Sequence, residues 1–353
     1  MVSAETSSPA TPPTEPAPQL SGSVLARPSV PSPVSAVDGV LAWAASSGRG
    51  HRFEIVVRHA GHNRRLGATS AVGRIVELKL GTAAHGRAIV VYSHCPKKIA
   101  GSNIEGAGCR LWWAPLAGGA AHLVRAAPRG TALGTAVEGT VTFVKPGRKF
   151  RLETASLAGS SAHALPAAPN VIEGSISDIS ATATGVAFLE QSEEPGSPDQ
   201  GLSQVWFSEG AATPRLITQV IGDTQEIDDA YQFFVGLTLS SEFIYTFLYA
   251  APGLIYEVPP GRKPVVPGLK RMTLTSPSTT TGSSEDLPFE GARIGLEWIS
   301  YDPSDQTLVA SLIPATTYYP GTSTPGRCAT DPASENVCPV ESFGPVSFPA
   351  AAG

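Results

Sequence analysis

The chain has 353 residues, of which 42% are apolar and only 16% charged, and its formal net charge at pH 7 is −5. The apolar content is enough for a sizeable core, while 36 Gly and 32 Pro interrupt the chain too often for long helices. The composition therefore excludes a largely helical protein. The low net charge and the lack of any run of basic residues speak against a nucleic-acid-binding protein.

The first 33 residues differ from the rest in composition. They are rich in Pro, Ser, Thr and Ala and lack periodic hydrophobicity, which predicts a disordered linker over residues 1–33. They also lack the basic and apolar regions of a signal peptide. A single folded domain is expected over residues 34–353.

A short apolar strand then recurs about every 45 to 65 residues, a period typical of repeat architectures. Most copies follow a Gly turn, and all are β-branched or aromatic, which favours buried strands over helices. The copies are Gly39–Trp43, Gly86–Tyr92, Gly139–Val144, Gly185–Glu190, Glu242–Leu248 and Gln306–Leu312.

Each copy is followed by further strand-like runs. Second strands are predicted at Phe53–Arg58, Cys109–Leu116, Phe150–Leu157, Gln204–Ser208 and Leu254–Val258. Third strands are predicted at Arg64–Leu66, His122–Arg125, His163–Leu165, Pro214–Thr218 and Lys263–Val266. Fourth strands fit at Arg74–Leu80, Ser175–Ile179, Gln232–Leu237 and Arg293–Ile299.

Four strands per unit and six units predict an all-β protein, a β-propeller of six four-stranded blades. The sixth unit lacks outer strands in sequence order, so we expect the chain termini to close the ring. The candidate closing strands are Gly22–Ala26 and Gly344–Phe348. Seven blades would result if Pro267–Ser276 and the C-terminal strand formed a blade of their own.

The most apolar window, Phe233–Tyr256, contains Glu242 and Pro252 and alternates like a β-hairpin. A membrane-spanning helix would place the carboxylate of Glu242 near the middle of the bilayer, at a cost of several kcal/mol. We therefore expect no transmembrane span.

The four cysteines fall into two local pairs, Cys95 with Cys109 and Cys328 with Cys338. Structural zinc prefers closer Cys-x2-4-Cys spacings, although His94 beside Cys95 could add a ligand. Two disulfides are expected, the second closing a C-terminal loop, and each stabilises by about 3 kcal/mol in the chain-entropy estimate. Disulfides indicate a secreted, periplasmic or cell-envelope protein.

Charge is distributed unevenly along the chain. Residues 34–168 carry 17 Lys and Arg against 6 Asp and Glu, whereas residues 169–353 carry 7 against 22. In a ring, one half is then basic and the other acidic. Such a field could orient a charged partner, or help the first and last blades to meet.

Acidic residues gather in one loop, at Asp223, Glu226, Asp228 and Asp229. Carboxylate oxygens are the ligands that Ca²⁺ prefers, so calcium is the one cofactor for which the chain offers candidates. The loop lacks the alternating pattern of an EF-hand, and loops of this kind are usually solvated acidic connections. No other cofactor is expected.

Three further carboxylates, Glu77, Asp178 and Glu297, lie at roughly equivalent places on the predicted inner strands. Converging on a central channel, they would raise one another's pKa and could act as general acid and base. Alternatively, they face outward between apolar neighbours.

The repeating module resembles that of the TolB-like and WD40-like six-bladed propellers, which serve mainly as protein-binding platforms. The Ser-Pro-Asp-Gly turn of the TolB-like family appears here only in altered form, as Asp302-Pro303-Ser304-Asp305. The resemblance implies a protein-binding platform. We expect an exported, monomeric binding or scaffold module whose partner is a protein or a cell-envelope glycan. A propeller-type glycoside hydrolase or lyase using the three channel carboxylates is the alternative.

Overall fold

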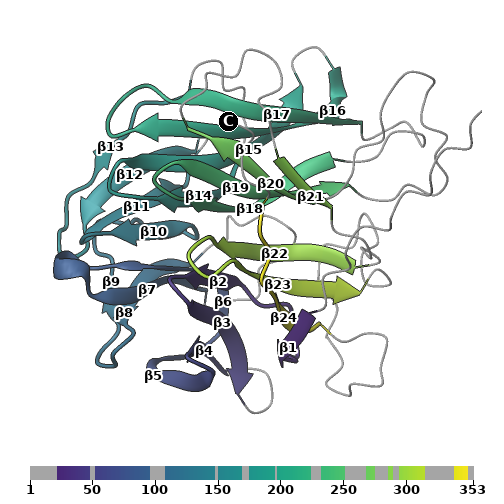
Figure 1. Ribbon diagram of the computed structural model, residues 1–353. Helices are drawn as coiled ribbons and strands as arrows, with labels where there is room; N and C mark the ends of the chain where they lie inside the picture. Colours follow the sequence, from purple (N-terminus) through teal and green to yellow (C-terminus); the bar gives the residue numbers. More distant parts are fainter. Residues whose placement is uncertain are drawn as a thin grey trace, which may run out of the picture.

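The protein is a six-bladed β-propeller, and each blade is a four-stranded antiparallel sheet (Figure 1). The computed structural model describes residues 22–47, 52–95, 108–147, 150–168, 175–194, 197–223, 232–250, 268–274, 285–288, 294–314 and 338–348. Its one helical element in this part of the chain is a single 3-10 turn, η1 (Ala84–Gly86).

The first three blades use consecutive strands, from the channel outward. Blade 1 consists of β2 (Val34–Val37), β3 (Val40–Ser47), β4 (Arg52–His59) and β5 (His62–Val72). Blade 2 consists of β6 (Arg74–Thr82), β7 (Ala88–Cys95), β8 (Arg110–Pro115) and β9 (His122–Leu123). Blade 3 consists of β10 (Gly134–Val137), β11 (Thr140–Lys145), β12 (Arg151–Ser156) and β13 (His163–Ala164).

Blades 4 and 5 follow the same order, and blade 6 takes its outermost strand from the other end of the chain. Blade 4 consists of β14 (Ser175–Ala181), β15 (Gly185–Glu194), β16 (Ser197–Glu209) and β17 (Arg215–Asp223). Blade 5 consists of β18 (Gln232–Leu239), β19 (Phe243–Ala250), β20 (Gly268–Thr273) and β21 (Glu285–Pro288). Blade 6 consists of β22 (Ile294–Asp302), β23 (Thr307–Pro314), β24 (Val340–Phe343) and β1 (Gly22–Ala26).

Each blade begins one strand earlier than the repeat in the sequence suggested. The recurring Gly-entered strand is the second strand of a blade, and the predicted fourth strand is the innermost strand of the next one. In blade 5, β20 is the third strand, and this leaves no separate seventh blade around Pro267–Ser276. The predicted strands Leu254–Val258 and Lys263–Val266 lie outside the described residues.

The chain ends close the ring, as expected. β1 pairs antiparallel with β24, with Gly22 opposite Phe343. The predicted linker of residues 1–33 therefore included a strand of the propeller, whereas residues 1–21 lie outside the described part. The second candidate closing strand, Gly344–Phe348, follows β24 without being a strand. It is anchored where Tyr301 Oη donates to the carbonyl oxygen of Val346 over 2.7 Å.

Within the described residues, backbone amides of blade 1 and its leading segment donate hydrogen bonds to side chains of blade 6. The amide of Ser32 donates to Ser311 Oγ (3.2 Å), that of Ala36 to Ser300 Oγ (3.0 Å), and that of Gly39 to Asp302 Oδ2 (2.6 Å). The Ser-to-amide contact recurs elsewhere in the ring, because Ser35 Oγ accepts from Leu80 and Ser180 Oγ from Leu239, both over 3.0 Å. The closing junction thus uses the same chemistry as the internal ones.

Among the described residues, four inner strands carry a β-bulge. The pairing register shifts between Ile75 and Glu77 in β6, and between Ile176 and Asp178 in β14. Corresponding shifts lie at Val235/Leu237 in β18 and Leu296/Trp298 in β22. In β18 the extra residue is Gly236, with φ at 66°, and a Cβ there would collide with Ile299 of the next blade. Bulges re-aim side chains, and here they decide what faces the channel.

Apolar side chains fill the spaces between blades. One cluster joins blades 1 and 2 around Ile55 and Leu78, and another joins blades 5 and 6 around Phe247 and Leu308. All four side chains are at most 1% exposed. Within the described residues, no helix is long and apolar enough to cross a membrane, and part of the apolar window Phe233–Tyr256 forms β18 and β19.

Candidate functional site

Four side chains from three inner strands meet in the central channel, and all but the partly buried Trp298 are buried. Glu77 and Lys79 come from β6, Asp178 from β14 and Trp298 from β22, and we call them the channel cluster. These strands belong to blades 2, 4 and 6, so the contacts between different strands of the cluster span two blades. The cluster therefore bridges the channel.

Lys79 and Asp178 form the central ion pair. Lys79 Nζ lies 2.7 Å from Asp178 Oδ1 and 2.9 Å from Oδ2, and the two side chains are 8% and 9% exposed. The amide of Ile179 donates a further hydrogen bond of 2.7 Å to Asp178 Oδ1. Burial opposes the charge on Lys79, but the attraction of Asp178 and Glu77 together outweighs it and raises the pKa of the ammonium group.

Glu77 is the more unusual acid. Trp298 Nε1 donates to its Oε2 over 3.3 Å, and the amide of Leu78 donates to its Oε1 over 3.2 Å. Burial raises the pKa of Glu77 to about 8; Lys79 lowers the value and Asp178 raises it further. Below this pH Glu77 is neutral beside the ion pair of Lys79 and Asp178, which costs less than burying a second carboxylate.

The two predicted acids Glu77 and Asp178 thus lie in one cluster, and Glu297 has a different place. It is the extra residue of the β22 bulge, equivalent to Val76 and Ser177 rather than to the two acids. In β22, Trp298 occupies the position that Glu77 has in β6 and Asp178 has in β14. The side chain of Glu297 lies outside the described part of the structure, so its role stays a prediction.

One buried acid outside the channel cluster was not predicted from the sequence. Glu190, on β15 of blade 4, is 2% exposed, and its Oε2 has no hydrogen-bond partner within the described residues. Burial raises the pKa of Glu190 to about 7, and the indole N–H of Trp206 offsets part of this rise without reaching hydrogen-bonding geometry. The residue sits in an otherwise strand-like run, Gly185–Glu190, so only its burial reveals it.

Most of the acidic loop around Asp223, Glu226, Asp228 and Asp229 lies outside the described residues. Glu226, Asp228 and Asp229 lie outside the described residues, and Asp223 ends β17 with its side chain outside them. Among the residues that are described, no group of three or more His, Cys, Asp or Glu could hold a metal ion. The calcium prediction is therefore untested.

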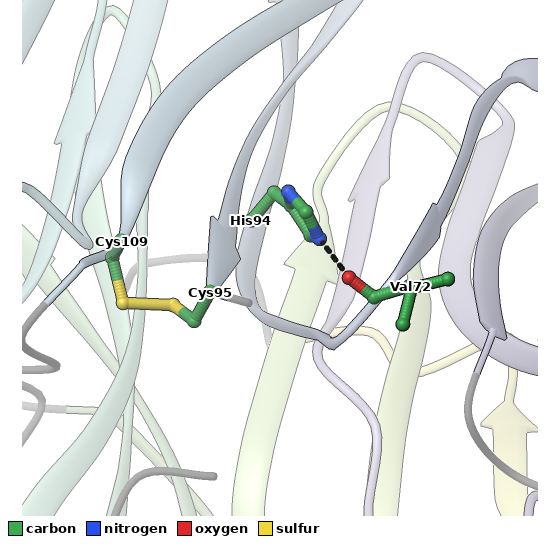
Figure 2. The surroundings of a disulfide bond; sticks show 4 residues. All are labelled: Val72, His94, Cys95 and Cys109. Carbon is green, nitrogen blue, oxygen red and sulfur yellow. Dashed lines mark hydrogen bonds between the residues drawn. A yellow bond between two sulfur atoms is a disulfide. The ribbon is translucent and has the colours of Figure 1, made fainter. Parts of the chain in front are cut away.

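One predicted disulfide joins β7 to the segment before β8, as Figure 2 shows. Cys95 and Cys109 are bonded, with Cα atoms 4.0 Å apart, and both are fully buried. Next to the bridge, His94 Nε2 lies 2.7 Å from the carbonyl oxygen of Val72 in blade 1 (Figure 2). The disulfide lies within blade 2, and the neighbouring His94 points to the opposite face, toward blade 1. Cys338 is also disulfide-bonded, and its predicted partner Cys328 lies outside the described residues.

Comparisons with known proteins give only distant structural similarity. No family model matches the chain, and no curated protein matches it. Among solved structures it is similar to the β-propeller domain of Cps50 (Swd1) from Myceliophteria thermophila, with 11% identity and a TM-score of 0.48 over 92% of this chain and 100% of that one.

Two other matches are to XC5397, a gluconolactonase from Xanthomonas campestris, and to the β-propeller domain of the Trilobed protease from Pyrococcus furiosus. The first has 12% identity and a TM-score of 0.47 over 98% of this chain and 99% of that one. The second has 10% identity and a TM-score of 0.42 over 81% and 93%. Two further matches are to larger chains, of which this chain spans 28% and 40%. At these values the six-bladed assignment rests on the strand pairing itself.

Proposed function

We propose that the protein is an exported binding or scaffold module, and that the channel cluster holds the ring together rather than catalysing a reaction. Rigid scaffolds commonly carry their binding residues on connections and rims, and a closed propeller offers both. The partner in this proposal is a protein or a cell-envelope glycan.

The observation that carries this proposal is the engagement of both channel carboxylates within the protein. A glycosidase needs one carboxyl group to protonate the leaving oxygen and another to attack or to activate water. Asp178 instead has Lys79 within 2.9 Å of both oxygens, and each oxygen of Glu77 accepts a hydrogen bond. Neither acid is more than 7% exposed as a residue, which leaves little access for a sugar.

Export is supported by the disulfide chemistry. Cys95–Cys109 is formed, Cys338 is bonded, and no cysteine of the described residues is free. Disulfides persist in secreted, periplasmic and envelope proteins and are rare where thiols are kept reduced. This supports the assignment to an oxidising compartment.

A glycoside hydrolase or lyase is the second candidate, and one observation favours it. Glu77 has a pKa raised to about 8 and lies beside a second acid, which is how a general acid keeps its proton at neutral pH. In that case Glu77 would donate the proton and Asp178 would act as base or nucleophile.

Product formation separates the two candidates. The oxidised wild-type protein and the Glu77→Gln variant are incubated with envelope polysaccharides, and new reducing ends and unsaturated uronates are measured. The binding proposal expects no product from either protein, together with equal co-sedimentation of both with insoluble envelope material. Turnover by the wild type that Glu77→Gln abolishes, with the fold intact by circular dichroism, would establish the enzyme instead.

A further inference from the structure

We propose that the β4–β5 hairpin of blade 1 is a binding site for an anionic polysaccharide, contacted through Arg58 and Arg64. This inference rests on the proposed binding function and names the surface and the ligand class. The site is the basic hairpin, residues Arg58–Arg65, at the outer rim of the propeller (Figure 1).

The basic hairpin concentrates positive charge at an exposed tip. It carries three arginines and two histidines and no acidic residue. Every residue from His59 to Arg65 is exposed, and Arg58 is half-buried. The turn residues Ala60 and Gly61 both have positive φ, at 48° and 81°, as a tight two-residue hairpin requires. The charges are therefore held on a short, well-defined turn.

Two of the three guanidinium groups are held by neutral oxygens. Arg58 Nη1 donates to Asn63 Oδ1 over 3.2 Å, and Arg64 Nη1 donates to the carbonyl oxygen of Ala117 in blade 2 over 3.4 Å. Arg65 pairs with Glu54. The ion pairs found among the described residues include neither Arg58 nor Arg64, so both keep their charge available to an anion.

The two arginines flank the tip. Val57 pairs with Arg64 and Arg58 with Asn63, so Arg64 and Arg58 project from opposite faces of the hairpin. Val57 and Leu66 pack toward blade 2, on the face that Arg64 shares. An extended polymer crossing the tip can thus meet a guanidinium group on each side.

Charged residues on an outer strand also prevent edge-to-edge aggregation, which is a simpler explanation of the arginines on β5. Charges that protect an edge are expected to be spread along its exposed length. The second half of β5, from Leu66 to Val72, has none, and Val72 there is 63% exposed. The charges gather at the tip instead, which favours binding over protection.

The chemistry of the surface selects the ligand class. Protein interfaces have apolar or aromatic centres, and nucleic-acid and neutral-sugar sites use aromatic stacking. Within the described residues the exposed large apolar side chains are Val24 and Val72, and neither belongs to the basic hairpin. Guanidinium groups bind carboxylate, sulfate or phosphate through paired hydrogen bonds and need no apolar centre. A hydrated polyanion satisfies these conditions best.

Binding is tested with the full oxidised chain and three probes by isothermal calorimetry at about 50 mM salt. The probes are polygalacturonate, which carries carboxylates, dextran sulfate, which carries sulfates, and neutral dextran. The Arg58→Gln/Arg64→Gln variant is expected to lose about tenfold or more in affinity for at least one polyanion. Its salt dependence should fall by about one unit of slope per arginine removed, as counterion release predicts.

The matched control is Arg129→Gln/Arg151→Gln, which removes two exposed arginines from the segment before β10 and from β12 of blade 3. It should change the affinity less than about twofold. An equal loss of affinity in the control would show that the polyanion responds to the overall charge of the protein and not to this hairpin, and would overturn the proposed site. Absence of binding to both polyanions, or tighter binding of polyglutamate at equal charge, would overturn the ligand class. A protein or neutral-glycan partner that the hairpin variant still binds would leave the proposed binding function standing.

Discussion

The channel cluster and the interior of blade 4 bury acids in opposite ways. In the channel, Asp178 is paired with a cation and Glu77 has donors to both oxygens. In blade 4, Glu190 is buried as deeply, but its Oε2 lacks a partner within the described residues. Burial alone therefore does not indicate a role. A partnered acid can stabilise the ring, whereas an unpartnered one weakens it as soon as it must ionise.

The largest effect is expected from Lys79→Met, which leaves Asp178 buried without its cation. Breaking a buried pair on one side costs about 3–5 kcal/mol, measured as the free energy of unfolding in urea. The control Lys145→Met breaks the pair with Glu153, in which the lysine side chain is 48% exposed, and should cost less than about 1 kcal/mol. Equal losses of unfolding free energy in the two variants would show that the buried Lys79–Asp178 pair stabilises the protein no more than the exposed Lys145–Glu153 pair.

The double variant Lys79→Met/Asp178→Leu tests whether the loss in Lys79→Met comes from the unpaired charge of Asp178. Replacing both charges by apolar groups of similar size removes the unpaired anion, so most of the lost stability should return. If the double variant is as unstable as the single one, the cost arises from packing and not from charge.

Stability should also fall as the pH rises from about 5 to 9. The pKa values of Glu190 and Glu77 are raised in the folded state to about 7 and about 8, from an ordinary value of 4.5. Between 4.5 and these values the unfolded chain has already released protons that the folded protein keeps, so the free energy of unfolding declines with pH. Urea titrations at several pH values test this, and a rise over the same interval would contradict it.

Glu190→Gln should abolish part of that decline. At pH 8.5 the variant no longer has to bury a charge, and we expect it to be about 1–2 kcal/mol more stable than the wild type. At pH 5 both side chains are neutral in the folded state, and the difference should be much smaller. Glu153→Gln serves as contrast, because it removes an acid that has Lys145 at 2.8 Å and should bring no gain.

The smallest effect is expected from Trp298→Phe. The change removes one hydrogen bond to Glu77, worth about 1 kcal/mol, and with it a donor that favours the ionised carboxyl. The pKa of Glu77 should therefore rise further, which a carbon-13 NMR titration of the labelled carboxyl group would measure. An unchanged pKa would mean that the indole does not act on this acid.

The sequence predicted the fold well because glycine turns and β-branched runs repeat in nearly every blade. It missed the inner strands Val34–Val37 and Gly134–Val137, which have only four residues each. Their signal lies in a local repeat, Ala36-Val37-Asp38-Gly39 and Ala136-Val137-Glu138-Gly139, whose acidic residue and glycine both have positive φ and form the hairpin turn.

The channel cluster was predicted only in part, because the sequence did not give the exact register of the inner strands. Glu297 lies one residue before the position of Glu77 and Asp178, and Trp298 occupies that position directly after the bulge that all three strands share. Lys79 was overlooked for another reason. An isolated lysine on a strand shows its role only when a carboxylate two blades away is seen beside it.

The pairing of β1 with β24 also sets the order of events in folding. Each of the first five blades is made of strands that are close in sequence, so they can form as the chain is synthesised. Blade 6 must wait for Val340–Phe343 before Gly22–Ala26 finds its partner, across nearly the whole chain. Such a long-range contact is slow to form, and until then both chain ends are exposed strand edges. The final step of folding is thus the joining of the two ends, and a fusion placed directly against Gly22 would act on that step before any other.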